Sequence, residues 1–419
     1  MVKNLICIII TLYGFASAVN NNTADVIFQK SQNCVYQIRV IDISTGKKSS
    51  IGSGFAVTEN GFLATNYHVV AEYIDEPKRF RLECIGPDGA INDLKLIDLD
   101  IVHDLAIVLL TKDSIPFLSF KTSVPSKGTR IYAMGNPMDL GMTIIEGTYN
   151  GLIEQSLYEK ILFSGSLNPG MSGGPSLDTY GNVIGINVST TGNEISFLVP
   201  VKYLQKLLDS ITIRKPGSTI DFTNRIEQEL FDNQEHYMSL LLNTAWKSDT
   251  LGKCLIPREI DNIFKSWGET SADSEMLYTA SYVYSVSNDD IYVSPRLTTG
   301  SIGIDYSWYE STKLSPSRFF QLLESHYENA SIPNYNAEKE LMPPRTHTRF
   351  VTISGQTWKT TTCIWKYKKF TRLHDVVMTL ALVSQAGSCM MIEMKLLGVS
   401  RDKSLAFCNK FMGAIAWVE

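Results

Sequence analysis

The chain has 419 residues, a length typical of two or three domains. Of these residues, 44% are hydrophobic and 19% charged, a composition that excludes a disordered or fibrous polypeptide. Its net charge of −5 and the lack of any run of five basic residues disfavour nucleic acid as a partner. No Cys-x-x-Cys or His-x-x-x-His spacing occurs, so we expect neither a metal site nor a cofactor.

The N-terminus has the pattern of a secretory signal. Lys3 supplies a positive charge, residues 5–13 form an apolar run, and residues 16–18 (Ala-Ser-Ala) form a small-x-small cleavage site. The apolar run is too short to cross a bilayer as a helix. We therefore expect residues 1–18 to be removed and the mature chain to be exported, to a periplasm or out of the cell, without a membrane span.

Residues 30–200 read as a β-rich domain. Short apolar or alternating runs are separated by Gly, Asn, Asp and Pro, as in an all-β barrel or sandwich; examples are GSGFAVT, RFRLECI, LAIVLL and NVIGINV. Residues 201–211 form the first helical pattern, with apolar residues on one face. The polar segment TIRKPGST follows it, so we place a domain boundary there and assign residues 19–213 to the first domain.

Residues 214–419 are expected to form an α+β accessory domain with an antiparallel sheet. Helical patterns cover residues 225–242, 315–327 and 404–416, and aromatic-rich strands lie between them. The histidines of this part are scattered and lie near no nucleophile motif. We expect this domain to fold independently and to bind a protein partner, without supplying a catalytic group.

The cysteines suggest disulfide bonds. Six remain once the signal is removed, and export places them in an oxidising compartment. Six cysteines allow 15 pairings, between which the sequence does not choose. Because Cys34 and Cys84 are the only two in residues 19–213, we expect them to be bridged or close together.

The segment NPGMSGGPS, residues 168–176, places three glycines and two prolines around Ser172. Glycine is favoured where the backbone has a positive φ or is approached closely, and it weakens ordinary structure. The segment is therefore either a surface turn or a loop that exposes Ser172 as a nucleophile and directs backbone N–H groups at an oxyanion.

A nucleophilic serine needs a general base and a carboxylate that orients the base. The β-rich domain has two histidines, His68 and His103. His68 follows the apolar run GFLAT, and Asp104 directly precedes the apolar run LAIVLL, so both would lie at strand ends. Asp98 and Asp100 are alternatives to Asp104, and His103 is interpreted as a neighbour without a catalytic role.

Four blocks, in this order, resemble the trypsin-like serine peptidases of the HtrA/Deg branch: GSGFAVTENGFLATNYHVVAE, HDLAIVLL, AMGNPMDLGMTIIEGTYNGLIE and NPGMSGGPSLDTYGNVIGIN. The resemblance covers residues 34–208 approximately and implies a chymotrypsin-like double β-barrel. It implies that His68 is the general base, Asp104 its carboxylate partner and Ser172 the nucleophile. It also implies that the backbone N–H groups of Gly170 and Ser172 form the oxyanion hole.

The resemblance places the primary substrate pocket beside the segment before Ser172 and along the strand INVSTT. The residues implied are small or medium and uncharged, which favours small or medium apolar side chains at the cleaved position; they are Ser166, Leu167, Val188, Ser189 and Thr190. Met171 stands where cleavage-activated trypsin-like enzymes have an Asp, so activation by a newly freed N-terminus is not expected.

The resemblance ends before residue 214, and no PDZ-like signature follows, which puts PDZ regulation and trimerisation in doubt. The function it implies is an exported serine endopeptidase that cleaves protein or peptide substrates through an acyl-enzyme. The alternative is a catalytically inactive binding protein on a protease-like scaffold; the intact set of His68, Asp104 and Ser172 counts against it.

Overall fold

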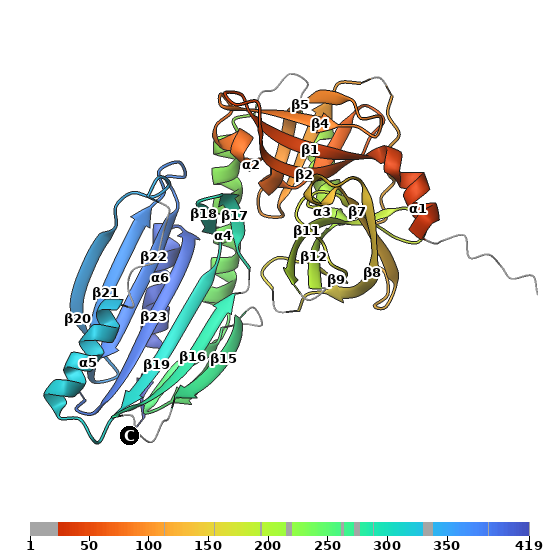
Figure 1. Cartoon of the computed structure of the whole chain (residues 1–419). Coiled ribbons are helices and arrows are strands. Elements are labelled where there is room, and N and C mark those ends of the chain that lie inside the picture. Colours follow the sequence, from red (N-terminus) through yellow and green to blue (C-terminus); the bar gives the residue numbers. More distant parts are fainter. Residues whose placement is uncertain are drawn as a thin grey trace, which may run out of the picture.

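The computed structural model describes residues 24–418 apart from residues 113, 155, 193–194, 215–219, 261–263, 272–276, 288, 330–337 and 384. The expected signal, residues 1–18, lies outside the described residues. Figure 1 shows a pair of small barrels beside a large sheet, with a long helix between them. Within the described residues, no helix combines the length and apolar character needed to cross a membrane.

The first barrel is a closed antiparallel sheet with strand order β1-β2-β3-β6-β5-β4. Helix α1 precedes it and α2 is inserted after β3. The bounds are α1 Ala24–Ser31, β1 Val35–Asp42, β2 Lys48–Ala56, β3 Phe62–Thr65, α2 Tyr67–Asp75, β4 Phe80–Ile85, β5 Ile91–Asp100 and β6 Leu105–Leu110. Strand β6, with sequence LAIVLL, is almost wholly buried, as its unbroken apolar run requires.

The second barrel is also closed, with order β10-β11-β12-β9-β8-β7. Its elements are β7 Arg130–Gly135, η2 Pro137–Asp139, β8 Thr143–Leu152, β9 Ile161–Ser164, β10 Pro175–Leu177, β11 Val183–Gly192, β12 Ile195–Pro200 and the following helix α3 Val201–Ile213. Buried side chains from both barrels, α1 and α3 form one hydrophobic cluster. The expected chymotrypsin-like double barrel is confirmed.

The C-terminal part is α+β with an antiparallel sheet, as expected. Its large sheet has seven strands in the order β15-β16-β19-β23-β22-β21-β20, and β13, β14 and β24 form a small sheet. The strands are β13 Lys247–Leu251, β14 Cys254–Glu259, β15 Phe264–Ser271, β16 Thr279–Ser287, β19 Ile302–Glu310, β20 Arg345–Ile353, β21 Gln356–Lys366, β22 His374–Leu382, β23 Ser388–Val399 and β24 Ala416–Trp417. A separate hairpin comprises β17 Ile291–Ser294 and β18 Leu297–Thr299.

Three helices accompany these strands: α4 Phe222–Asn243, α5 Pro316–Asn329 and α6 Arg401–Gly413. They correspond to the three expected helical patterns. Helix α6 begins at Arg401 and not at the predicted Ser404, because the side chain of Ser400 accepts a hydrogen bond from the N–H of Lys403 and caps the helix there. Its predicted end, residue 416, lies instead in strand β24.

The expected Cys34–Cys84 disulfide is absent, since all six cysteines of the described residues are free and buried. Cys34 packs in the cluster between the two barrels, whereas Cys84 packs inside the first barrel. Both therefore act as small apolar side chains. Burial raises the pKa of both thiols, that of Cys84 to about 12, so neither is readily ionised.

The barrels and the C-terminal part share a hydrophobic cluster. Tyr67 and Ala71 of α2 and Leu99 of β5 are buried with apolar residues of α4, of the β17–β18 hairpin and of the segment 367–373. In Figure 1, α4 and the hairpin lie on the side of the large sheet that faces the barrels. Independent folding of residues 214–419 stays a prediction. Without the barrels, this part would have to expose the apolar side chains that it contributes to the shared cluster.

A chain truncated after residue 218 is expected to unfold at a lower temperature than the barrels of the full chain. Truncation exposes Tyr67, Ala71 and Leu99, and burying one large apolar side chain contributes roughly 1.5–3 kcal/mol. Far-ultraviolet circular dichroism with an apolar dye measures both the transition and the exposed surface. An unchanged transition without dye binding would show that the barrels do not depend on the shared cluster.

Candidate active site

His68 and Asp104 lie on neighbouring ends of strands in the first barrel. His68 is in the first turn of α2, directly after β3, and Asp104 is in the turn between β5 and β6. Asp104 has a positive φ of 54°, a conformation that Asp tolerates better than most residues. The side chain of Asn66 donates to the Asp104 carbonyl at 2.8 Å. This turn directs the carboxylate towards the start of α2.

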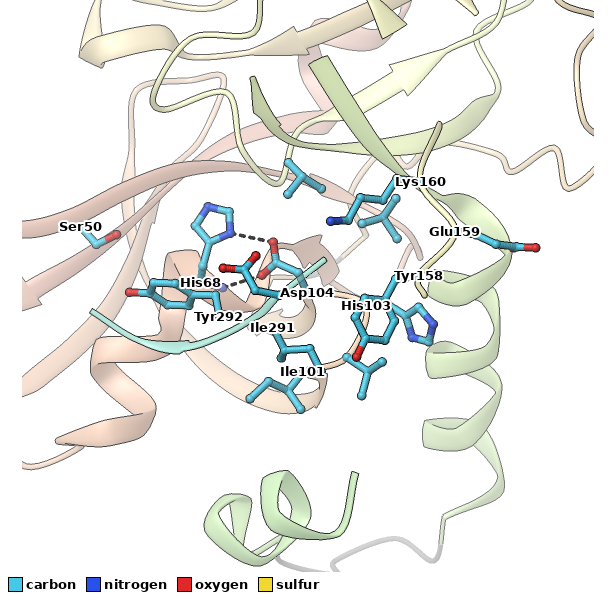
Figure 2. A pocket seen from close by; sticks show the side chains of 14 residues that line it. Ser50, His68, Ile101, His103, Asp104, Tyr158, Glu159, Lys160, Ile291 and Tyr292 are labelled. Carbon is cyan, nitrogen blue, oxygen red and sulfur yellow. Dashed lines mark hydrogen bonds and ion pairs between the residues drawn. The ribbon is translucent and has the colours of Figure 1, made fainter. Parts of the chain in front are cut away.

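Asp104 binds His68 through both carboxylate oxygens. Its Oδ1 accepts from the backbone N–H of His68 at 2.9 Å, and its Oδ2 lies 2.7 Å from His68 Nδ1, as Figure 2 shows. A carboxylate at Nδ1 favours the tautomer with the proton on Nδ1, which leaves Nε2 able to accept a proton. Burial lowers the pKa of His68, but the charge and hydrogen bond of Asp104 outweigh burial and raise the pKa overall.

We expect kcat/KM to decrease as the pH falls through a midpoint above the ordinary histidine pKa of about 6.5. The raised pKa means that His68 is protonated, and unable to act as a base, over a wider acidic range. A pH–rate profile on a short peptide measures the midpoint. His103→Gln is the matched control, because His103 has the same kind of bond to Asp100. A wild-type midpoint below about 6, or one that moves with His103→Gln, would contradict the assignment.

Ser172 lies in the loop before β10, and its backbone is fixed by the first barrel. Its carbonyl accepts from the N–H of Ser53 at 2.7 Å. Its hydroxyl donates to the carbonyl of Val188 in β11 at 2.7 Å. The single hydroxyl proton is therefore held by β11 and not by His68, and a rotation about χ1 is needed to transfer the bond.

The loop before Ser172 leaves two N–H groups available. Within the described residues, the N–H groups of Gly170 and Ser172 have no hydrogen-bond partner. The Pro169 carbonyl accepts from the N–H of Met138 at 2.8 Å. Because a trans peptide directs its C=O and N–H oppositely, this bond turns the Gly170 N–H away from Met138.

Two glycines of the loop are required by space and by backbone conformation. Gly170 has a φ of +95°, and a Cβ there would lie 2.5 Å from the Asn136 carbonyl oxygen. Gly173 has a φ of +84°, and its Cβ would lie 2.2 Å from the Ser53 carbonyl oxygen. The glycine-rich segment therefore forms a tight loop docked against both barrels, and not a free surface turn.

Buried polar side chains that the sequence interpretation missed hold this loop. Ser53 Oγ donates to the Gly170 carbonyl at 2.7 Å and accepts from the N–H of Asn136 at 2.9 Å. Asn187 Nδ2 donates to the carbonyls of Met134 and Met171 at 2.9 and 3.3 Å. The sequence marks Ser53 and Asn187 only weakly, because Ser and Asn are common in strands. Both residues nevertheless lie inside the sequence blocks that resemble the HtrA/Deg branch.

The alternatives to Asp104 are engaged elsewhere. Asp100 Oδ2 lies 2.7 Å from Nδ1 of His103, whose ring stacks on Tyr203 at 3.7 Å between centroids. Asp98 is fully buried and pairs with Arg214 of the segment after α3. Neither rival carboxylate therefore serves His68.

Within the described residues, no three His, Cys, Asp or Glu side chains are grouped so as to hold a metal ion.

The five predicted pocket residues do not all face one space. Leu167 is only 5% exposed and packs in the second barrel with Met171. Ser166 is exposed, and Val188 lines a cavity of about 450 Å³ that also contacts His68 and Asp104. Ser189 and Thr190 follow in β11, but their side chains lie outside the described part of the structure.

The cavity beside His68 includes residues that sequence interpretation did not connect with the site. Tyr158 and Lys160 come from the loop before β9, and Asp290, Ile291 and Tyr292 come from the C-terminal part. Figure 2 shows Tyr292 next to the imidazole of His68. No motif marks these residues, because their position depends on how the two parts pack.

Comparisons with known proteins match the part of the chain that forms the two barrels. Residues 52–186 match the family model of the trypsin-like peptidase domain. A probable periplasmic serine endoprotease, DegP-like, of Chlamydia trachomatis is 32% identical over 171 residues, 38% of this chain and 33% of the relative. Serine protease HTRA1 of Xenopus tropicalis is 32% identical over 167 residues, 38% of this chain and 35% of the relative. The chain thus spans about a third of the length of these relatives.

Among solved structures, the serine endoprotease from Yersinia pestis has a TM-score of 0.40 and 22% sequence identity, covering 45% of this chain and 66% of that one. An HtrA-type protease solved with a tripeptide has a TM-score of 0.41 and 24% identity, covering 46% of this chain and 64% of that one.

Proposed function

Because residues 52–186 belong to the trypsin-like peptidase domain family and have HtrA/DegP-type serine endoproteases among their relatives, we propose that the protein is an exported serine endopeptidase. Ser172 is its nucleophile, His68 the general base and Asp104 the group that orients the base. The observation that carries the proposal is the His68–Asp104 pair at 2.7 Å. The pair borders a cavity that is also lined by Val188 of β11, whose carbonyl accepts the hydrogen bond of the Ser172 hydroxyl.

Substrate binding prepares the nucleophile in this proposal. From Val188 onward, β11 pairs with β12 on one side, and within the described residues no strand occupies its other side. A substrate backbone that pairs with this free edge donates an N–H to the Val188 carbonyl. The Ser172 hydroxyl is then displaced from that carbonyl and turns to His68 Nε2.

The reaction follows the acyl-enzyme route. The hydroxyl proton passes to His68 Nε2 as Ser172 Oγ attacks the scissile carbonyl carbon, and the carbonyl π electrons move to the oxygen. The unpaired N–H groups of Gly170 and Ser172 bind this oxyanion; each such donor contributes about 2.7–4 kcal/mol. Collapse of the intermediate returns the electrons, breaks the C–N bond and gives the His68 proton to the leaving amine. Water repeats the sequence to release the acyl group.

The remaining assignments are part of the same proposal. The uncharged Ser166 beside the loop favours a small or medium apolar side chain at the cleaved position, with Ser189 and Thr190 as further pocket residues. Of the other two expected residues, Leu167 supports this pocket from the core of the second barrel, and Val188 borders the cavity beside His68. The chain is placed in a periplasm or outside the cell, which the word periplasmic in the names of its relatives supports. Residues 19–213 carry the protease, and residues 214–419 form the accessory domain.

An inactive binding protein is the second candidate, favoured by the bond of the Ser172 hydroxyl to Val188 instead of His68. A fluorophosphonate separates the two, because it bonds covalently to an activated serine. We expect the purified full chain to be labelled at Ser172, and the Ser172→Ala variant to remain unlabelled. Failure of the wild type to react, together with no hydrolysis of an unfolded protein, would favour the binding protein.

A further inference from the structure

A hairpin of the C-terminal part reaches the catalytic residues. It comprises β17 and β18 with their flanks, residues 289–300. The ring of Tyr292 lies 6.1 Å from that of His68 between centroids, with an edge-on angle of 74°. The hydroxyl of Tyr67, the residue before His68, donates to the Val293 carbonyl at 2.9 Å. The hairpin is therefore bonded to the same helical turn that carries the general base.

A buried carboxylate anchors the start of the hairpin to the second barrel. Asp289 is 4% exposed, and its Oδ2 accepts from the hydroxyl of Ser156 and the N–H of Leu157, both at 2.7 Å. Lys160 Nζ lies 3.4 Å from its Oδ1. A buried carboxylate with this many donors is costly to detach.

The loop that holds Asp289 also contacts the far end of the hairpin. The hydroxyl of Tyr158 lies 3.5 Å from the Gly300 carbonyl and accepts from the side chain of Asn233 in α4 at 2.8 Å. Both ends of the hairpin are therefore fixed to one loop of the protease, residues 156–160. The position of Tyr292 beside His68 is set by this attachment.

The hairpin forms one wall of the 450 Å³ cavity. Opposite walls come from the β5–β6 turn and from Val188 in β11. Half of the fourteen lining residues are apolar or aromatic: Ile101, Val102, Tyr158, Val188, Val199, Ile291 and Tyr292. Apolar and aromatic walls of this kind are typical of a site that accepts an apolar group. Burial, and then the negative charge of Glu72 and Asp104, raises the pKa of Tyr292 to about 12, so its phenol is neutral.

The geometry of an added strand decides which substrate residue reaches this cavity. Successive side chains of a strand point to opposite faces. The residue that carries the scissile carbonyl directs its side chain to one face of the free β11 edge, where the proposed primary pocket lies. The residue before it directs its side chain to the other face, towards His68 and the hairpin.

We propose that the β17–β18 hairpin completes this second subsite and that Tyr292 is a specificity-determining residue, so that the enzyme prefers a large apolar or aromatic side chain immediately before the cleaved residue. The proposal rests on the proposed peptidase function and deepens it. The C-terminal part then contributes to substrate selection inside the cleft while supplying none of the reacting groups.

Two peptides that share a cleaved residue and differ only in Phe or Gly before it test the proposal. We expect the wild type to favour the Phe peptide by about tenfold or more in kcat/KM. Tyr292→Ala should lose most of that preference through slower cleavage of the Phe peptide alone, whereas Tyr292→Phe should keep it. Arg296→Ala is the control, because Arg296 lies at the exposed hairpin turn and does not line the cavity.

Asp289→Asn is a second route to the same result if Tyr292→Ala does not fold by circular dichroism. This variant keeps every residue that lines the cavity but weakens the bonds that hold the hairpin in place. It should therefore also reduce the preference for the Phe peptide. An unchanged preference for the Phe peptide in folded variants would overturn the proposal. An equal increase of kcat/KM on both peptides would also overturn it, because the hairpin would then only restrict access to the site. Fluorophosphonate labelling separates the two levels: a labelled wild type with unchanged preference rejects only the subsite, whereas an unlabelled wild type rejects the peptidase function and the subsite with it.

Discussion

Ser172→Ala is expected to lower kcat by at least about 10⁴-fold while the protein stays folded. The change removes the only atom that can form the acyl-enzyme, and the loop backbone that offers the Gly170 and Ser172 N–H groups stays anchored through Ser53. Any residual rate comes from binding and from those N–H groups alone. Hydrolysis of a short peptide, with circular dichroism for folding, gives the result.

The same measurement on His68→Ala and on the double variant tests whether the two residues act in one step. Because the proton leaves Ser172 only as His68 accepts it, the double variant should be little slower than either single one. Ser126→Ala, an exposed serine outside the site, is the control. If the losses in activity of the two single variants added up in the double variant, Ser172 and His68 would not act in one step. A wild-type rate for Ser172→Ala would show that Ser172 is not the nucleophile.

The contact between His68 and Asp104 could be predicted from sequence because local patterns encode the position of each residue. His68 and Asp104 each adjoin an apolar strand, and the barrel closes β3 against β6, so their separation along the chain is overcome by direct strand pairing. The glycines around Ser172 were informative because a positive φ and close contacts to other backbone atoms leave no alternative residue.

Other features depend on non-local packing that no motif marks. The Cys34–Cys84 pairing was wrong because counting cysteines says nothing about which hydrophobic cluster each one enters. The place of Tyr292 beside His68 follows from a buried Asp289 and from a core shared between α2, α4 and the hairpin. In sequence, the hairpin is only a short apolar run in an aromatic-rich half.

Asp104→Asn is expected to leave the fold intact and to lower kcat by about 10⁴-fold, roughly 5.4 kcal/mol in activation free energy. Asp104 Oδ1 accepts from the backbone N–H of His68, so the amide oxygen of the substituted side chain takes that position. The NH₂ group of the new amide then faces His68 Nδ1, which must become the acceptor. The imidazole proton moves to Nε2, which can no longer accept the proton of Ser172.

The pH–rate profile of Asp104→Asn distinguishes this cause from a general loss of structure. Without the carboxylate charge, the pKa of His68 should decrease, and the acidic limb of the profile should move to lower pH in the residual activity. Asp100→Asn is the matched control, since Asp100 makes an equivalent bond to His103 and not to His68. If Asp100→Asn caused the large loss, or if Asp104→Asn stayed within about tenfold of the wild type, Asp104 would not be the residue that orients the base.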